Sequence, residues 1–446
     1  MTDTPAPTYD SFTELPPHER LAAQSDVVMR FGLSLLGAGA GAYRVKASMA
    51  RLAHAVGIET HRAQVTFTEI TTTSVANGTF RTEIGETRRA GVDADKIDRL
   101  RAFARQLRPG MSVEECHTAL DQIDAAKPLY GAVTNALASA FACAAFAFLN
   151  KGGPVECAVV FLASFVGQAL RRQLMRRHVN HFGVWMLCGA VGALTYIGTV
   201  TGLNMLQLID HSHQAGVISA ILFLVPGFPL VTGILDLVRM DLLAGITRLA
   251  YVGVLLGSTG IAVWTVSASL HWEVAAVAHP SLDPLMLNLL RIVASFVAAC
   301  GFAMLFNSPP KVAAVAALIG AFTNTGRLLL VDYTPIASQA AVGLAALFIG
   351  IFASVLGTVT RYSRVTLSVP AVVIMIPGVP LYRALTAMSN GEVTLAFSQI
   401  VQVVFVVAAI GVGLAISRML TDPGWRHDQD ITHTRELFRG AVAKVR

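Results

Sequence analysis

Apolar positions fill most of the chain after residue 130, whereas before it apolar and polar positions alternate over short distances. A helix needs about 20 apolar residues to cross roughly 30 Å of hydrocarbon. By that measure we expect about ten transmembrane helices, at residues 130–150, 154–173, 182–204, 214–236, 241–268, 284–306, 310–330, 335–357, 367–388 and 393–417.

The first part of the chain has the pattern of a small soluble domain. Apolar residues recur at three- and four-residue steps over 25–57, which predicts helix, and alternate over 63–88, which predicts strands joined by a turn at Asn77-Gly78. Residues 93–107 and 112–126 have the pattern of amphipathic helices. Ser112 stands at an N-cap position and Glu115 at the capping-box position. We therefore expect an α+β domain.

The whole chain is expected to be mainly α: a polytopic membrane protein of about ten transmembrane helices in two inverted five-helix repeats, behind that small domain. The expected boundaries are a disordered tail at 1–24, a soluble cytoplasmic domain at 25–128, a first repeat at 129–272, a second repeat at 280–418 and a cytoplasmic tail at 419–446.

Charge supports this division. Residues 1–129 hold 16 of the 28 acidic and 15 of the 34 basic residues, and mean hydropathy is +0.58. Loops on the side of the N-terminal domain carry eight basic residues, and the opposite loops carry Lys151 alone, which predicts cytoplasmic N- and C-termini. The eight are Arg171, Arg172, Arg176, Arg177, Arg239, Lys311, Arg361 and Arg364. No signal peptide is evident near the start, and the basic excess does not indicate nucleic-acid binding.

A repeated motif is the strongest clue to function. The fourth expected span contains Pro226-Gly227-Phe-Pro229, and the ninth contains Pro377-Gly378-Val-Pro380. Proline removes a backbone donor and breaks a helix, and freed backbone groups inside a membrane must face protein or a wet cavity. A packing kink explains one such motif equally well. Two at equivalent places of inverted halves favour a central substrate site, where half-helix N-termini present amides to a carboxylate.

Charged residues inside the expected spans add candidates. Arg383 follows the second motif as Thr232 follows the first, and an intramembrane Arg is costly enough to suggest function. Asp236 is a candidate for an ammonium or a coupling proton. Asp241 is a second coupling candidate, with an ordinary helix-end pair with Arg239 as the alternative.

A polar stripe on the seventh span comprises Asn324, Thr325 and Arg327, with Asp332 as the expected partner of Arg327. Arg248 and Arg291 are expected to reach toward opposite membrane surfaces. The substrate-binding residues expected from sequence are Pro226, Gly227, Thr232, Asp236, Asn324, Thr325, Arg327, Pro377, Gly378 and Arg383.

Other chemistry finds little support in the sequence. The five cysteines lack metal or disulfide spacing, so no metal or other cofactor is expected. His61, Ser112, Cys116 and His117 could be imagined as hydrolytic residues, but no known hydrolase motif surrounds them. We expect no enzyme activity.

Several stretches resemble the threonine/serine exporters: LLGAGAGAYRVKASMARLAHAVGI at 35–58, the Gly152-Gly153 turn with Glu156, PGFPLVTGILDLVRMDLLAGITR at 226–248 and VPAVVIMIPGVPLYRAL at 369–385. Lys46 departs from the acid that this family usually carries after Arg-Val. The resemblance implies export of small hydroxy amino acids across the bacterial inner membrane, driven by the proton motive force. It also implies that both halves of a sometimes split exporter are fused here.

We therefore expect a secondary exporter of threonine or serine with alternating access around the two broken helices. Arg383 would take the carboxylate and Asp236 the ammonium or a proton. Three alternatives stay open: a dicarboxylate exporter for a substrate such as succinate, a membrane-anchored hydrolase acting through the N-terminal domain, and a gated channel. The expected partners are the amino acid, protons and membrane lipid. Nucleic acid is not expected, and a homo-oligomer is left open.

Overall fold

The computed structural model describes residues 15–87, 91–209, 213, 216–272, 282–360, 362–422 and 425. These residues form two compact units. The first, which we call the soluble unit after the sequence prediction, comprises the described residues up to Lys127 together with Arg239–Thr247. The second, which we call the helical unit, comprises Pro128–Val238 and the described residues of 248–426. Most of the expected tails, and Arg361, lie outside the described residues.

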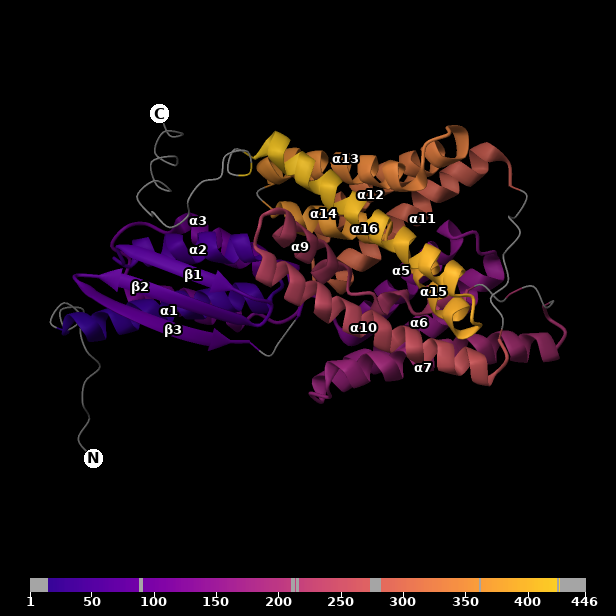
Figure 1. Cartoon of the computed structure of the whole chain (residues 1–446), viewed down its shortest axis with the longest axis horizontal. Coiled ribbons are helices and arrows are strands. Elements are labelled where there is room, and N and C mark those ends of the chain that lie inside the picture. Colours follow the sequence, from indigo (N-terminus) through magenta and orange to yellow (C-terminus); the bar gives the residue numbers. More distant parts are fainter. Residues whose placement is uncertain are drawn as a thin grey trace. The chain divides into compact units, whose positions relative to one another are not determined.

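The soluble unit has three layers. An antiparallel sheet in the order β1-β2-β3 is covered by α1 and α2, and α3 and α4 pack on those helices (Figure 1). The elements are α1 (Pro17–Gly37), α2 (Ala42–Ala55), β1 (Thr60–Val65), β2 (Glu69–Ala76), β3 (Thr79–Glu86), α3 (Ala94–Gln106) and α4 (Val113–Asp124).

Several local predictions for this unit are confirmed. Asn77 and Gly78 have positive φ and form the turn between β2 and β3. Ser112 caps α4, and Glu115 completes the capping box. The sheet has one strand more than the hairpin that the alternation suggested, because β1 precedes it.

The expected disorder over residues 1–24 is wrong from Pro17 onward. Pro17 occupies the first position of α1, where its missing N–H costs nothing. Leu21 is buried, and the side chain of Gln24 donates to the carbonyl of Val56 at 2.5 Å. The polar run at 18–20 concealed the apolar face of this helix.

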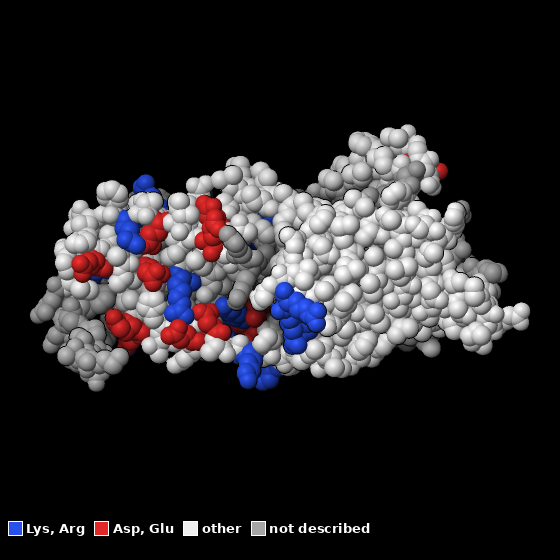
Figure 2. All heavy atoms as spheres, turned by 90° about the horizontal axis from the view of Figure 1, so that it is seen from below, with Lys and Arg blue, Asp and Glu red and all other residues white. Residues whose placement is uncertain are grey.

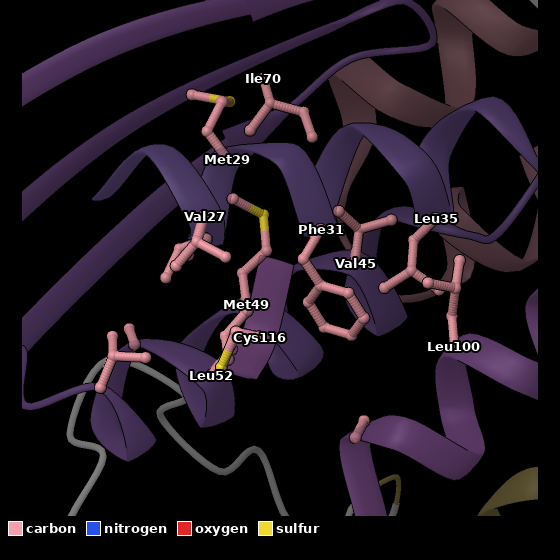
Figure 3. Close-up of a cluster of buried hydrophobic side chains, with 14 of the residues drawn as sticks. Val27, Met29, Phe31, Leu35, Val45, Met49, Leu52, Ile70, Leu100 and Cys116 are labelled. Atoms are coloured by element: carbon pink, nitrogen blue, oxygen red, sulfur yellow. The ribbon is translucent and has the colours of Figure 1, made fainter. Parts of the chain in front are cut away.

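The core of the soluble unit is apolar and well filled. Figure 3 shows Phe31, Val45 and Met49 of α1 and α2 pointing toward one another, with Ile70 of β2 and Leu100 of α3 around them. Ala244, from the segment Arg239–Thr247, belongs to the same core. A short segment far along the chain therefore completes this unit.

Eight of the ten expected spans are present as long apolar helices. Among the described residues, eight helices are long and apolar enough to cross a membrane. They are α5 (Ala132–Leu149), α6 (Pro154–Arg176), α7 (His181–Met205), α10 (Leu242–Ser269), α11 (Pro284–Leu305), α12 (Pro310–Tyr333), α13 (Ser338–Thr360) and α16 (Val393–Thr421). On the face that Figure 2 shows, charged side chains are dense on the soluble unit and sparse on the helical unit.

The fourth and ninth expected spans are each broken in two, as the Pro-Gly motifs predicted. The first is divided into α8 (Val217–Ala220) with the short 3-10 helix η2 (Leu222–Leu224), followed by α9 (Gly227–Val238). The second is divided into α14 (Arg364–Val373) and α15 (Gly378–Ser389). Each half thus has the same order: three long helices, a broken helix and a final long helix.

Candidate functional site

The two breaks have the same backbone geometry. Gly227 N–H donates to the carbonyl of Val225 at 2.8 Å, and Gly378 N–H donates to that of Ile376 at 2.9 Å. The second proline of each motif lies in the first turn of the new helix, where a missing N–H interrupts no helical hydrogen bond. The motif therefore ends one helix and starts another.

The breaks also pack against each other reciprocally. A Cβ placed on Gly227 would lie 2.6 Å from Cγ2 of Val373, and one on Gly378 would lie 3.3 Å from Cδ1 of Leu222. Val373 stands five residues before Gly378, and Leu222 stands five residues before Gly227. Each motif glycine therefore lies against the residue that stands five positions before the other motif glycine. The absence of a side chain on glycine permits this close approach.

Side chains satisfy the carbonyls that the first break frees. Arg171 of α6 donates to the carbonyl of Phe223 at 2.7 Å, and the indole of Trp185 on α7 donates to that of Leu224 at 2.6 Å. The Arg171 guanidinium also lies over the Trp185 ring, 5.2 Å from its centroid. Ser164 donates to the carbonyl of Ala220 at 2.9 Å. Buried donors therefore hold open a non-helical backbone inside the helical unit.

A small apolar cavity of about 40 Å³ lies beside the crossing. Its walls come from both halves and include Leu222, Val225, Thr259, Gly378 and Tyr382. The Tyr382 hydroxyl donates to Ser267 on α10 at 3.1 Å. In this conformation the space at the crossing is far smaller than the roughly 300–1,000 Å³ of a typical small-molecule site.

A buried charged cluster follows the first break along α9. Arg248 of α10 donates from Nη1 to the hydroxyl of Thr232 at 2.8 Å, and its Nε lies 3.6 Å from Oδ2 of Asp236. The side chains of Arg248 and Asp236 are 1% and 4% exposed. Thr232 and Asp236 are four residues apart and share a helix face. The expectation that Arg248 reaches toward the membrane surface is therefore wrong: its polar partners on α9 hold it inside.

The polar stripe on α12 is partly as expected. Asn324 donates to Ser295 of α11 at 2.9 Å, and Arg327 donates from Nε to the Asn324 amide oxygen at 2.9 Å. Thr325 is buried, and its hydroxyl has no hydrogen-bond partner among the described residues. Asp332 pairs with Arg291 at 2.5 Å, so the expected pairing with Arg327 is wrong. Arg291 lies nearly two turns along α11 from the start, within reach of the end of α12.

Arg383 and Asp241 lie apart from these groups. Arg383 is exposed on α15 between the buried residues Tyr382 and Ala384, so the structure does not bring it to Thr232 or Asp236. Asp241 belongs to the soluble unit, where it pairs with Lys46 of α2. Among the described residues Arg239 lies over the ring of Tyr43, 3.2 Å from its centroid, and the ion pair of Asp241 is with Lys46, not with Arg239.

The candidate hydrolytic residues of the soluble unit do not form a catalytic group. His61 is buried against Ser74, and burial lowers its pKa to about 4. Burial raises the pKa of the Cys116 thiol to about 11, which keeps it protonated and a poor nucleophile. Ser112 serves as a cap, and His117 contacts Arg30.

Sequence reasoning missed Arg171, Trp185 and Arg248 as parts of this region. Arg171 and Arg248 lie near the ends of expected spans, where an arginine side chain usually extends so that its guanidinium is in water. No sequence pattern around Trp185 indicated a role, because only the tertiary fold brings its indole to the Leu224 carbonyl.

The eight apolar helices, the two breaks and the polar groups buried between them define a multi-pass membrane transport protein. The family model for threonine/serine exporters matches residues 26–270, and a second one, described as threonine/serine exporter, ThrE, matches residues 291–420. The chain belongs to the threonine/serine exporter family, with both parts in one polypeptide, and is a membrane exporter.

Two curated relatives carry another substrate in their names. The chain is 24% identical over 249 residues to the probable succinate transporter subunit YjjP of Escherichia coli (strain K12), covering 55% of this chain and 94% of that protein. It is 25% identical to the protein of the same name in Klebsiella aerogenes, covering 54% and 92%. No solved structure significantly matches the chain.

Proposed function

We propose that the protein exports threonine and serine across the bacterial inner membrane by alternating access around the crossing of its two broken helices, driven by the proton motive force. The reciprocal packing of Gly227 and Gly378 supports a crossing at which two halves can rock. Membership of the exporter family supports the substrate class.

The proposal includes ten membrane crossings in two inverted five-helix repeats, with both termini in the cytoplasm. The same order of helices in each half and matching contacts support it: α8 packs on α5, α6 and α7, and α14 packs on α11, α12 and α13. The distribution of basic residues supports the orientation. Each broken helix counts as one crossing.

The buried cluster of Thr232, Asp236 and Arg248 is the observation that carries the substrate proposal. A hydroxy amino acid bears a carboxylate, an ammonium and a hydroxyl. Arg248, Asp236 and Thr232 offer a matching cation, anion and hydroxyl within one buried group. The attraction within a buried ion pair offsets little more than the cost of removing both charges from water. A zwitterion bound between Arg248 and Asp236 would replace their single ion pair with two, one between Arg248 and the carboxylate and one between Asp236 and the ammonium. Arg383 stays a second candidate for the carboxylate in another conformation of α15.

A dicarboxylate is the second candidate, favoured by the names of the curated relatives. Its two carboxylates would need two cations, and Asp236 beside Arg248 would repel one of them. The buried cluster therefore favours the amino acid. Arg327 and Arg171, both half-buried, are the cations that a dicarboxylate could use instead.

The deciding experiment measures efflux of labelled threonine, serine and succinate from proteoliposomes that contain the full chain, with and without a proton gradient. We expect gradient-driven efflux of threonine or serine, little efflux of succinate, and impaired efflux in Asp236→Asn. Arg383→Lys and Arg383→Ala test the second carboxylate site. Transport of succinate alone, or efflux unaffected by the gradient, would refute the proposal.

A further inference from the structure

A pair of titratable groups, one buried and one half-buried, lies away from the crossing, at the end of the helical unit where α5 ends and α6 begins. Glu156, in the first turn of α6, has a side chain only 3% exposed. One of its carboxylate oxygens accepts from Gly153 N–H at 2.9 Å and so caps the start of α6. The other lies 2.8 Å from Nδ1 of His213.

His213 connects this carboxylate to water. Its side chain is 19% exposed and lines an open hollow of about 970 Å³. Its wall includes the polar side chains of Thr201, Asn204 and Gln207. Polar side chains from the end of α7 make up part of this wall, which suits a water-filled entrance better than a lipid-facing one.

The Tyr196 hydroxyl links His213 to the residue at which the first broken helix begins. The Tyr196 hydroxyl on α7 donates to the carbonyl of His213 at 3.0 Å and accepts from Gly216 N–H at 3.2 Å. The carbonyl of Gly216 accepts from Ala220 N–H and so begins α8. Any change in the attraction between His213 and Glu156 therefore acts on the start of the broken helix.

We infer that Glu156 and His213 form the site that takes up the coupling proton from the side of the hollow. This inference rests on the proposed proton-driven export. One proton lies between Glu156 and Nδ1, because a carboxylate only accepts hydrogen bonds. A second proton from water binds at Nε2, turns the imidazole into imidazolium and strengthens its attraction to the carboxylate. Loss of that proton reverses the change.

Among the described residues around Glu156, His213 is the side chain of the class that ordinarily changes charge near neutral pH. Of the described titratable side chains, Tyr196 of α7 and Cys157 of α6 are the others that interact with Glu156. A phenol and a thiol ordinarily titrate well above pH 7, whereas an imidazole changes charge between pH 5 and 8. A structural cap alone would not require a histidine at the mouth of a hollow.

The variant Glu156→Gln distinguishes a proton-binding role of Glu156 from a purely structural role as the cap of α6. The glutamine keeps an oxygen for Gly153 N–H, as in a normal capping box, but cannot bind a proton. His213→Asn keeps a donor close to the Nδ1 position and likewise cannot titrate. Glu115→Gln is the matched control, because it makes the same change at the exposed capping box of α4.

Threonine efflux is measured in proteoliposomes with an imposed proton gradient, and threonine exchange without one. Coupled sites typically change each other's equilibria by about 5–150-fold. We expect gradient stimulation to fall to near one in Glu156→Gln and His213→Asn, while exchange continues and Glu115→Gln matches the wild type. Full stimulation in either variant, or loss of exchange together with a lowered melting temperature, would overturn the inference.

A second measurement does not depend on transport. Nuclear magnetic resonance of ¹⁵N-histidine-labelled full-length protein follows the imidazole of His213, and His213→Asn identifies its signal. We expect this imidazole to titrate in the wild type and its midpoint to fall in Glu156→Gln, which removes the anionic partner. An unchanged midpoint would overturn the inference. Titration as expected in a wild type without gradient-driven efflux would refute the proposed function while keeping the site.

Discussion

The two broken helices share a backbone but differ in what surrounds it. At the first break the backbone carbonyls accept hydrogen bonds from the side chains of Arg171, Trp185 and Ser164. Arg248 of α10 lies beside Asp236 of α9, the helix that follows this break. At the second break the Tyr382 hydroxyl donates to Ser267, most described neighbours are apolar, and Arg383 is exposed. Matching positions at the two breaks thus differ in chemistry. The first half supplies charge and hydrogen bonds, and the second half supplies a closely fitting surface.

The largest expected difference between the halves concerns their arginines. Arg248→Met leaves Asp236 buried without its cation, which typically costs about 3–5 kcal/mol. Arg383→Met removes an exposed side chain and should change stability by less than about 0.5 kcal/mol. Thermal melting of the purified variants in detergent measures both.

A double variant tests the cause of that loss. Asp236→Asn combined with Arg248→Met should recover much of the stability, because neither charge then remains buried alone. Equal losses from Arg248→Met and Arg383→Met would contradict the assignment of buried charge to the first half.

The glycines at the crossing should respond unequally. Gly227→Ala places a methyl group 2.6 Å from Val373, whereas Gly378→Ala places one 3.3 Å from the end of Leu222. Overpacking typically costs about 1–3 kcal/mol, so Gly227→Ala should lie in that range and Gly378→Ala below it. Melting and threonine efflux measured together would show whether the tighter contact also limits movement. The reverse order would mean that the crossing is tighter at the second glycine.

Hydrogen bonds to the backbone should matter more at the first break. Trp185→Phe removes the donor to the Leu224 carbonyl, and a buried acceptor left without its partner costs about 1–3 kcal/mol. His181 stacks on the same ring and provides a nearby contact that Phe keeps. No loss of stability on Trp185→Phe would mean that water replaces the indole.

The smallest expected effect lies at the second break. Tyr382→Phe removes the hydrogen bond to Ser267 but keeps the ring, so the loss should be about 0.5–1.5 kcal/mol. Ser267→Ala should cost a similar amount, and the two together no more than either alone, if this bond is the whole effect. Additive losses would point to separate roles for the two side chains.

Patterns along the chain predicted the helices well because hydrophobicity and helix breakers act locally. The eight long helices begin and end within a few residues of the expected spans, and both Pro-Gly motifs break a helix. Pairings between side chains depend on packing and were harder to predict. Asp332 pairs with Arg291 instead of Arg327, and Arg248 turns inward. Sequence position gives the depth of a charge but not the direction in which its side chain points.

The discontinuous core of the soluble unit has a consequence for biosynthesis. Ala244 fills part of that core, Asp241 pairs with Lys46, and Phe67 N–H donates to the Thr247 hydroxyl. The ribosome adds about 5–20 residues per second, so this segment emerges on the order of 5–20 s after Lys127. Until then, while α5 to α9 are synthesised, the part of the soluble unit that precedes residue 128 has an apolar site that Ala244 does not yet fill. A fragment that ends at Lys127 would keep that site open permanently and should bind chaperones or aggregate, whereas a fragment that continues through α10 carries its own missing piece.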